Sequence, residues 1–334
     1  MITIIKKAFF LALIFSLVAC QNKPSYIYNE GIIFGTFYHI KYDYKEDLKD
    51  EIQEKLNEVN KSLSTFDSLS VLSKINRNIP VRLDSHFVIV FNKAQEISAQ
   101  TDGAFDMTVS ELVNAWGFGF KSEKFPTQTV IDSLMQYVGY RKIKINNDTV
   151  YKENQKVTID ASAIAKGYGV DVVANYLESK GIKNYLVEIG GEIRLKGINP
   201  KNQKWSLAID KPIDDSLGIL EEYQEILYLD SGAVATSGNY RKFYYKNGQK
   251  YSHTINPKTG YPVNHQLLSV TVYTKDCMSA DAYATSFMVM GKDRAISFLS
   301  KHKDLQVYLI YAVDSNKTEI WKTKDFFKIL KTNS

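Results

Sequence analysis

Two oxygen-bearing side chains near the C-terminal end of the chain have the spacing of a small cation site. Asp281 and Thr285 are four residues apart in MSADAYATSFMVM, which predicts a helix of small residues over 278–290. Residues at this spacing lie on the same helix face. A carboxylate and a hydroxyl are hard oxygen ligands of the kind that Mg²⁺ accepts beside waters and phosphates. Taken alone, such a pair is more often a helix cap or a solvated face.

A segment over residues 158–197 has the chemistry of a phosphate site. Its sequence, TIDASAIAKGYGVDVVANYLESKGIKNYLVEIGGEIRLKG, predicts a strand that ends at Asp160, a helix that carries Lys166, and a strand over Tyr185–Ile189 that is closed by two glycines. A helix N-terminus presents free N–H groups to an anion, small residues allow close approach, and a lysine adds positive charge. The alternative is a glycine-rich turn with a surface lysine.

Two further motifs carry groups suited to proton transfer and phosphate binding. His253 stands shortly before a Pro-Lys-Thr-Gly turn, and an imidazole beside a tight turn can act as a general base near neutral pH. A histidine satisfied within a strand is the commoner alternative. The segment TSGNYR, residues 236–241, contains hydroxyls, a glycine and Arg241, and such groups bind phosphate or else form the polar edge of a hairpin.

The elements that must position these residues follow from hydrophobic periodicity. Strands and helices are interspersed without regular alternation, which favours an α+β fold with a mixed sheet over a doubly wound one. Residues 101–140 read as a helical excursion, and residues 142–157 as a hairpin. Helices are predicted over residues 45–64, 86–100, 278–290 and 292–301, and strands over 31–44, 205–209, 226–234, 269–273, 307–312 and 318–321.

The charge and the N-terminus restrict the class of protein. The 334 residues carry a formal net charge of +5, and the scattered Lys and Arg residues exclude the basic stripe typical of nucleic-acid binding. Residues 1–19 are typical of a secretory signal peptide, with Lys6 and Lys7 before a short apolar run. Cys20 follows Leu-Val-Ala, as in the bacterial lipobox, so we expect a lipidated cysteine and a tether over 20–28. If Cys20 is lipidated, Cys277 has no disulfide partner. The alternative is a chance cysteine near the cleavage site.

The motifs together, in their order and spacing, resemble one family. IDASAIAKGYGVD, YLVEIGGEIRLKG, ATSGNYRKFY, YSHTINPKTGYPV and MSADAYATSFMVMG are similar to motifs of the ApbE-type FAD:protein FMN transferases, and the resemblance runs from Gly35 to about Gly291. It implies a T-fold-like α+β architecture in which residues 29–334 form one compact catalytic unit. It also implies Mg²⁺-dependent transfer of FMN from FAD to a Thr hydroxyl of a target protein, with release of AMP.

The resemblance assigns a role to each candidate residue. His253 is implied as the base for the acceptor Thr, and Lys166 as a group that assists at the phosphates. Asp281 and Thr285 are implied as side-chain ligands of Mg²⁺, and Ala163 and Ala284 as backbone ligands, which requires irregular backbone at both alanines. FAD contacts are implied for Tyr38, Phe66, Ala104, Phe105, Asp106, Asp160, Lys166 and Ile255, with Ser237 and Gly238 at the border of the same cleft.

Two other functions stay open on the sequence. Water in place of the acceptor hydroxyl would make the protein an FAD pyrophosphatase that yields FMN and AMP, and loss of the chemistry would leave an FAD-binding lipoprotein. The resemblance implies exported flavin-accepting partners, such as subunits of NADH:quinone reductase or Rnf-type complexes. It also implies attachment to a membrane through the N-terminal lipid, on the periplasmic side of the cell envelope, and no nucleic acid.

Overall fold

An eight-stranded antiparallel sheet organises the chain in the computed structural model, which describes residues 26–119, 125–213, 222–240, 242–314 and 317–330. The order of the strands is β1-β2-β5-β6-β9-β12-β13-β14. Buried and more exposed side chains alternate along β2 and β5, whereas β12 and β13 each bury four consecutive residues because both faces of the sheet are covered there. The strands are β1 (Tyr26–Ile33), β2 (Thr36–Asp43), β5 (Tyr185–Ile189), β6 (Glu192–Lys196), β9 (Ser231–Gly238), β12 (Leu267–Thr274), β13 (Gln306–Ala312) and β14 (Thr318–Lys322).

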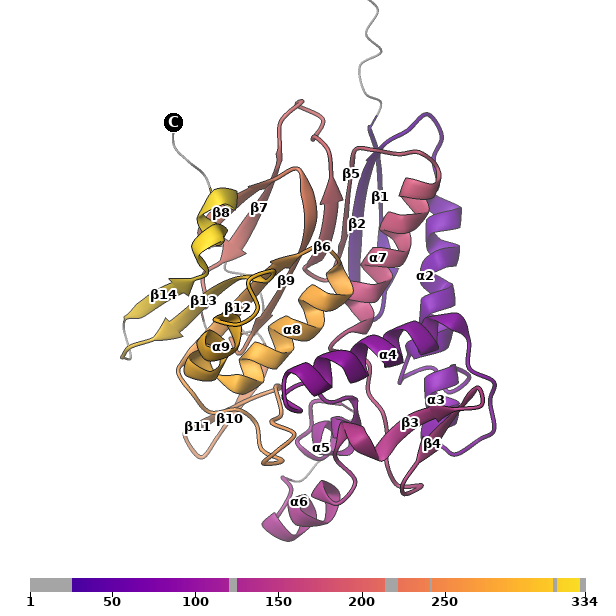
Figure 1. Ribbon diagram of the computed structural model, residues 1–334, viewed down its shortest axis with the longest axis vertical. Coiled ribbons are helices and arrows are strands. Elements are labelled where there is room, and N and C mark those ends of the chain that lie inside the picture. Colours follow the sequence, from indigo (N-terminus) through magenta and orange to yellow (C-terminus); the bar gives the residue numbers. More distant parts are fainter. Residues whose placement is uncertain (1–25, 120–124, 214–221, 241, 315–316, 331–334) are drawn as a thin grey trace, which may run out of the picture.

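Helices cover one face of this sheet. α7 (Ala165–Ser179) and α8 (Cys277–Met290) pack against each other and against the strands, with α2 (Lys49–Leu63) beside α7 and α4 (Ser85–Gln100) beside α8 (Figure 1). α2 buries Ile52, Leu56, Val59 and Leu63 at helical spacing, as its sequence predicts. In the part of the chain that the structure describes, no helix is both long and apolar enough to cross a bilayer.

A small two-stranded sheet covers part of the opposite face. β7 (Trp205–Asp210) pairs with β8 (Tyr223–Leu229). Their apolar residues pack with Leu195, Tyr308 and Ile310 of the large sheet, and with Phe326 of the 3₁₀ segment η3 (Lys324–Ile329). Tyr308 and Ile310 alternate along β13 with Val307 and Leu309, which face the helices instead.

The remaining elements form the excursions around the helical layer. The predicted hairpin at residue 146 and the predicted hairpin at residue 247 are both confirmed. The remaining helices and strands are α3 (Val71–Asn76), η1 (Met107–Val109), α5 (Ser110–Ala115), α6 (Gln128–Met135), η2 (Tyr140–Lys142), β3 (Ile143–Asn146), β4 (Thr149–Lys152), β10 (Phe243–Lys246), β11 (Gln249–Ser252) and α9 (Lys292–Leu299).

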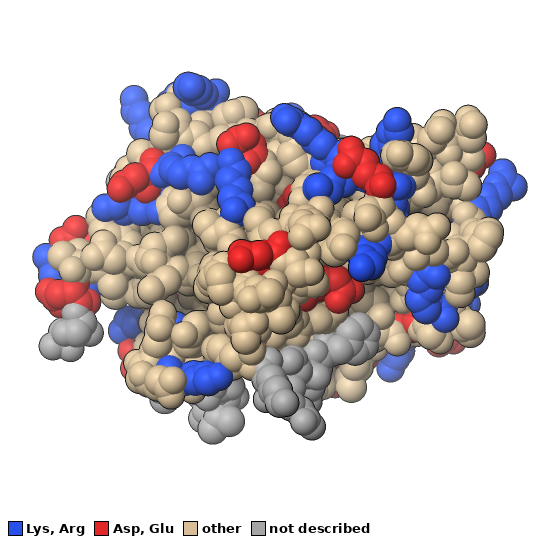
Figure 2. All heavy atoms as spheres, turned by 90° about the horizontal axis from the view of Figure 1, so that it is seen from below, with Lys and Arg blue, Asp and Glu red and all other residues tan. Residues whose placement is uncertain are grey.

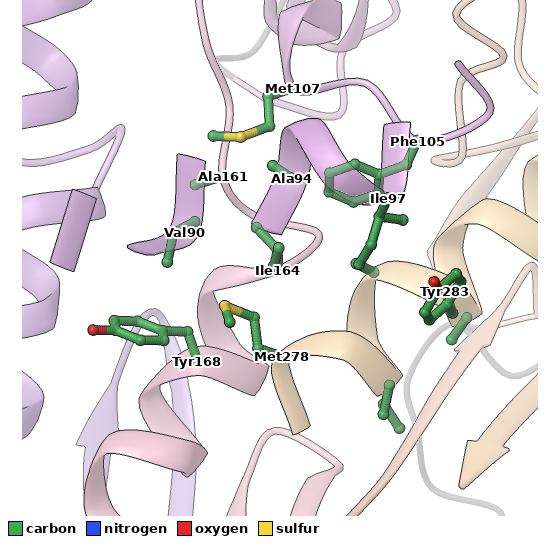
Figure 3. Close-up of a cluster of buried hydrophobic side chains, with 14 of the residues drawn as sticks. Val90, Ala94, Ile97, Phe105, Met107, Ala161, Ile164, Tyr168, Met278 and Tyr283 are labelled. Atoms are coloured by element: carbon green, nitrogen blue, oxygen red, sulfur yellow. The ribbon is translucent and has the colours of Figure 1, made fainter. Parts of the chain in front are cut away.

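A shared apolar core fixes the start of α7 against α4 and α8. Figure 3 shows Ile164, at the entrance to α7, facing Ala94 of α4, with Met278 of α8 beside it. The backbone at this entrance therefore rests on fully buried side chains. Members of the same cluster include Val90, Ile97, Phe105, Met107, Ala161 and Tyr168.

Two predicted strands were wrong. Residues 158–160 form no strand, because the N–H of Ile159 donates to Asn76 Oδ1 and the N–H of Asp160 donates to the Met107 carbonyl, each at 2.7 Å. The apolar run over 226–234 is divided between β8 and β9, and the chain passes from the small sheet to the large one at Asp230. Both strands are largely apolar, so periodicity did not separate them. The segment over 158–197, predicted as strand, helix and strand, therefore begins without a strand. In it α7 is followed by β5, which pairs in antiparallel fashion with its neighbours.

Candidate active site

The first turn of α7 is joined to α8 through a side chain. The N–H of Gly167 donates to Asp281 Oδ2 at 3.1 Å. Gly167 is in the first turn of α7, where backbone N–H groups have no partner within the helix, so Asp281 caps one of them. Ala163 precedes the N-cap residue Ile164, and its carbonyl lies outside the helix. The irregular backbone predicted at this alanine is therefore present, since the helix begins only at Ala165.

Gly167 permits this contact because it has no Cβ. A Cβ at this position would lie 2.3 Å from the carbonyl oxygen of Cys277 and 2.9 Å from Cβ of Asp281. Both are closer than non-bonded atoms approach, so any larger residue would force α7 and α8 apart. The glycine in IAKGYG thus serves close helix packing.

Asp171 is a second buried carboxylate that links α7 to α8. Asp171 of α7 accepts hydrogen bonds from the N–H groups of Cys277 and Met278, at 3.0 and 2.8 Å, and from Arg194 Nη1 at 3.0 Å. It therefore satisfies free N–H groups at the start of α8. Sequence analysis missed this residue. The available signal was an aspartate within the otherwise apolar buried stripe of α7, beside Val170 and Val173.

Lys166 lies between two acidic side chains. Its Nζ is 2.9 Å from Glu192 Oε1 and 4.0 Å from Asp281 Oδ2. Burial opposes the ammonium charge, but the charges of Asp281 and Glu192 outweigh it and raise the pKa of Lys166. Burial also raises the pKa of Glu192, to about 7, although Lys166 opposes this. Glu192 is the second residue that sequence analysis left without a role.

Two of the residues predicted to hold a metal lie one turn apart on α8. Asp281 is 4 % exposed, and Thr285 is half-buried with its hydroxyl 3.2 Å from that of Ser237 on β9. The Asp281 carboxylate, the Thr285 hydroxyl and a backbone carbonyl such as that of Ala163 are hard oxygen donors that suit Mg²⁺. Within the described residues there is no cluster of three or more His, Cys, Asp or Glu side chains suited to a metal. Backbone and substrate oxygens would therefore have to complete the coordination.

The backbone at Ala284 differs from the expectation. α8 runs without interruption from Cys277 to Met290, so the predicted irregularity at Ala284 was wrong. The helix continues because Ala284 is fully buried among small and apolar neighbours, and nothing there replaces the helical hydrogen bonds. Its carbonyl offers a metal only the lone pair that a helical hydrogen bond leaves unused.

His253 faces this cluster from the end of β11. Its Nδ1 lies 3.2 Å from the carbonyl oxygen of Lys242, an atom that can only accept, so Nδ1 carries the hydrogen and Nε2 keeps its lone pair. Its ring makes an edge contact with Phe118, at 6.3 Å between centroids. Burial and the charges of Lys242 and Lys166 lower the pKa of His253 to about 4. The neutral imidazole that results is able to accept a proton.

The side chains of the predicted FAD segment at residues 104–106 point into the protein. Ala104, Phe105 and Asp106 are all buried, and Phe105 lies in the core of Figure 3. Asp106 accepts hydrogen bonds from the N–H groups of Thr108 and Tyr140, at 2.8 and 2.7 Å, and so ties this loop to η2. The Asp106 carboxylate is therefore already hydrogen-bonded within the protein.

Asp160 lies in the turn before α7, and two other predicted FAD contacts lie at the end of β9. Asp160 Oδ1 accepts from the N–H of Ser162 at 2.7 Å, which orders the turn into α7. Ser237 and Gly238 are half-buried at the end of β9, beside Thr285. Ile255 is buried in a separate apolar cluster with Trp116 and Ile131, so its backbone is the part available to a ligand. Arg241 lies outside the described residues.

The two aromatic residues predicted to contact FAD have opposite environments. Phe66, in the loop after α2, is 74 % exposed and is suited to stacking on a flat ring. Tyr38 is 1 % exposed, and its hydroxyl donates to Gln53 of α2 at 3.2 Å. The structure does not bring Tyr38 to this site, because strand alternation directs it under α2. Phe34, at the turn before β2, packs instead against Gly169 of α7, one turn after Lys166.

A family model covers most of the chain. The model of the ApbE family matches residues 34–309. The chain belongs to the ApbE family. Curated ApbE-like relatives named FAD:protein FMN transferase include one from Vibrio cholerae, 38 % identical over 92 % of this chain and 94 % of the relative, and one from Haemophilus influenzae, 37 % identical over 96 % of each.

Solved structures of the ApbE family agree with the fold. The flavin transferase ApbE from Vibrio cholerae has a TM-score of 0.83 at 37 % identity, and covers 92 % of this chain and 99 % of its own. The Pseudomonas stutzeri flavinyl transferase ApbE in its apo form has a TM-score of 0.81 at 28 % identity, with 93 % and 98 % covered. The α+β fold predicted from the sequence is thereby confirmed.

One face of the molecule carries charges of both signs (Figure 2). On the face seen from below in Figure 1, positive and negative side chains are interspersed, and no extended area has one sign (Figure 2). Many of the described lysines are paired with carboxylates, including Lys55, Lys93, Lys204 and Lys211. This face has no stripe of positive charge of the kind that follows a nucleic-acid backbone.

Proposed function

We propose that this protein transfers FMN from FAD to a Thr hydroxyl of a target protein and releases AMP, in a reaction that depends on Mg²⁺. The observation that carries the proposal is the buried group at the start of α7, where Asp281 accepts a hydrogen bond from the N–H of Gly167 and lies 4.0 Å from Lys166. A pure structural contact would not require this set of charged groups, because burying them is costly. The relatives named FAD:protein FMN transferase support the same function.

The groups of this chain suit displacement at a phosphorus atom. In the reaction, the Thr oxygen forms a bond to the FMN phosphorus, the pyrophosphate bond breaks, and AMP leaves with the bridging oxygen. His253 Nε2, which keeps its lone pair, accepts the Thr proton. Lys166 supplies positive charge near the phosphates. Bound Mg²⁺ would supply Lewis-acid charge neutralisation of the phosphate oxygens, and Asp281, Thr285 and the Ala163 carbonyl would hold it.

FAD itself would be held by groups around this cluster. Phe66 offers an exposed ring for stacking, and the backbone of residues 104–106 and of Ile255 offers hydrogen-bonding groups. Asp160 lies at the entrance to α7, where a helix N-terminus favours an anion. Ser237 and Gly238 would border the phosphate end, next to Thr285.

The protein would act on exported partners. We propose that residues 1–19 direct export, that Cys20 is lipidated, and that the domain works at the membrane on the periplasmic side. These residues lie outside the described part of the chain, and the proposal rests on their sequence. The acceptors would be flavin-carrying proteins of that compartment, such as subunits of NADH:quinone reductase or Rnf-type complexes.

One incubation distinguishes the possible functions. Purified protein is mixed with FAD, Mg²⁺ and a target domain that carries an acceptor Thr, and the products are separated by gel fluorescence and chromatography. Covalent flavin on the target together with AMP supports the transferase. Free FMN with AMP and an unlabelled target would identify a pyrophosphatase, and unchanged FAD would identify a binding protein. A target with the acceptor Thr changed to Val is the matched control.

A further inference from the structure

The Lys166 ammonium has two acidic neighbours but is bonded to only one of them. It is 2.9 Å from Glu192 and 4.0 Å from Asp281, and both carboxylates are almost fully buried. The Lys166 stem is flexible, and an ammonium is a compact charge that can pair with either carboxylate. The shorter distance therefore shows that Glu192 holds the Lys166 ammonium in this arrangement.

Glu192 is held rigidly and is incompletely satisfied. It is the first residue of β6 and pairs with Ile189 across the turn formed by Gly190 and Gly191, whose φ angles are +60° and +97°. Its Oε1 takes the bond from Lys166, while its buried Oε2 has no hydrogen-bond partner among the described residues. A buried carboxylate in this condition is costly. Its retention points to a role other than stability.

Asp281 is in a similar condition. Its Oδ2 accepts from the N–H of Gly167 at 3.1 Å, and among the described residues its Oδ1 has no hydrogen-bond partner. A divalent cation and the Lys166 ammonium would compete for this carboxylate. If Lys166 moved about 1 Å closer, it would form a direct ion pair with Asp281, and a cation would have to displace it.

We propose that Glu192 is a positioning residue that holds Lys166 away from Asp281 and thereby keeps the Asp281 carboxylate open to a divalent cation. This inference rests on the metal site of the proposed function. It assigns Glu192 to neither the ligand set nor proton transfer. Its effect on the cation passes through Lys166.

The competing explanation is direct attraction. Any carboxylate near a cation raises its affinity, so weaker binding in Glu192→Gln would not by itself separate the two explanations. A double-mutant cycle with Lys166→Met does so, because the effect of Glu192 disappears with Lys166 only if it acts through that residue. Met and Gln are close in size to the residues they replace, so neither substitution overpacks the site or leaves a large cavity.

The experiment measures binding of Mn²⁺, as a probe of the Mg²⁺ site, by electron paramagnetic resonance in the absence of flavin. We expect Glu192→Gln to weaken Mn²⁺ binding about 10- to 100-fold in the wild-type background, as loss of a group that orients a ligand does. In the Lys166→Met background we expect a change of less than about twofold. Lys166→Met alone should bind Mn²⁺ at least as tightly as the wild type, since the competitor is gone.

Two results would overturn the proposal. They are an equal loss of affinity in both backgrounds, which indicates direct attraction, and no loss in Glu192→Gln. Circular dichroism and thermal unfolding without metal check that each variant is folded, and Glu192→Asp provides a second carboxylate variant, which should retain most of the affinity. Wild-type protein that binds Mn²⁺ but labels no target would contradict the proposed transferase alone. Wild-type protein that does not bind Mn²⁺ would contradict both.

Discussion

The peptide N–H of Gly167 and the carboxylate of Asp281 are joined by a hydrogen bond of 3.1 Å across 114 residues of sequence. This bond joins the first turn of α7 to α8 and satisfies an N–H that has no partner within its own helix. It therefore fixes the orientation of a buried carboxylate at the point where the two helices meet.

The close contact at Gly167 predicts an unusual sign for a glycine substitution. Gly→Ala inside a helix ordinarily stabilises by up to about 1 kcal/mol. At Gly167 the new Cβ would lie 2.3 Å from a backbone oxygen, so we expect Gly167→Ala to destabilise the protein by about 1–3 kcal/mol, as overpacking does. The measurement is urea unfolding. Gly169→Ala on the same helix is the control, because its Cβ meets the end of the mobile Phe34 ring. Equal stability of the two variants would contradict the packing argument.

Loss of the Asp281 charge should remove the response of stability to Mg²⁺. In Asp281→Asn the amide oxygen can still accept from Gly167, so the fold is expected to persist. A ligand that binds the native state at 100 times its Kd stabilises by about 2.7 kcal/mol. We expect this increase in the wild type and none in the variant. Thermal unfolding with and without Mg²⁺ measures it. Asp293→Asn, at an acidic side chain that is 92 % exposed on α9, is the matched control and should respond like the wild type.

The exposed ring of Phe66, which the proposed function assigns to flavin stacking, should matter for flavin binding and not for folding. Phe66→Ala is expected to weaken FAD binding by about 1–3 kcal/mol, the range for stacking of an aromatic side chain on a base. The free energy of unfolding should change by less than about 0.5 kcal/mol, because the side chain is on the surface. Leu69→Ala is the control, since Leu69 has the same 74 % exposure in the same loop. FAD fluorescence titration measures the affinity of each variant. An equal loss of FAD affinity in the two variants would refute stacking at Phe66.

Removal of the imidazole should separate binding from transfer. His253→Gln keeps a polar side chain but provides no base, so FAD affinity should stay within about twofold while the transfer rate falls by about 10² to 10⁴. Single-turnover labelling of the target domain, beside an FAD titration, measures both quantities. Transfer at the wild-type rate would exclude His253 as the base.

The lowered pKa of His253 has a consequence for stability at acid pH. Its usual value is about 6.5, and the folded protein lowers it to about 4. Above pH 6.5 the imidazole is neutral in both states. As the pH falls from 6.5 towards 4, the unfolded state binds the proton first, so the wild type loses stability. The difference in unfolding free energy between wild type and His253→Gln should therefore shift against the wild type between pH 7 and pH 4.5. A constant difference would contradict the shift.

Much of the fold follows from local patterns. The helical stripe of α2 and the turn residues at Asn146 and Asn247 predicted elements that the structure contains. Ile159 and Asp230 show where such patterns fail. Ile159 reads as part of a strand, but its N–H is satisfied by the Asn76 side chain, and Asp230 stands where one apolar run passes between two sheets. Periodicity reports burial, and it does not report which partner a buried segment finds.

The order of residues alone was enough for the α+β class and the resemblance to the ApbE family. It also picked out Asp281, Thr285, Lys166 and His253, because their chemistry is a property of residue type and spacing. Folding was needed to show that Tyr38 lies under α2, that α8 is continuous at Ala284, and that Asp171 and Glu192 surround the site. The physical reason is that burial, helix contact and ion pairing depend on distances between groups far apart along the chain.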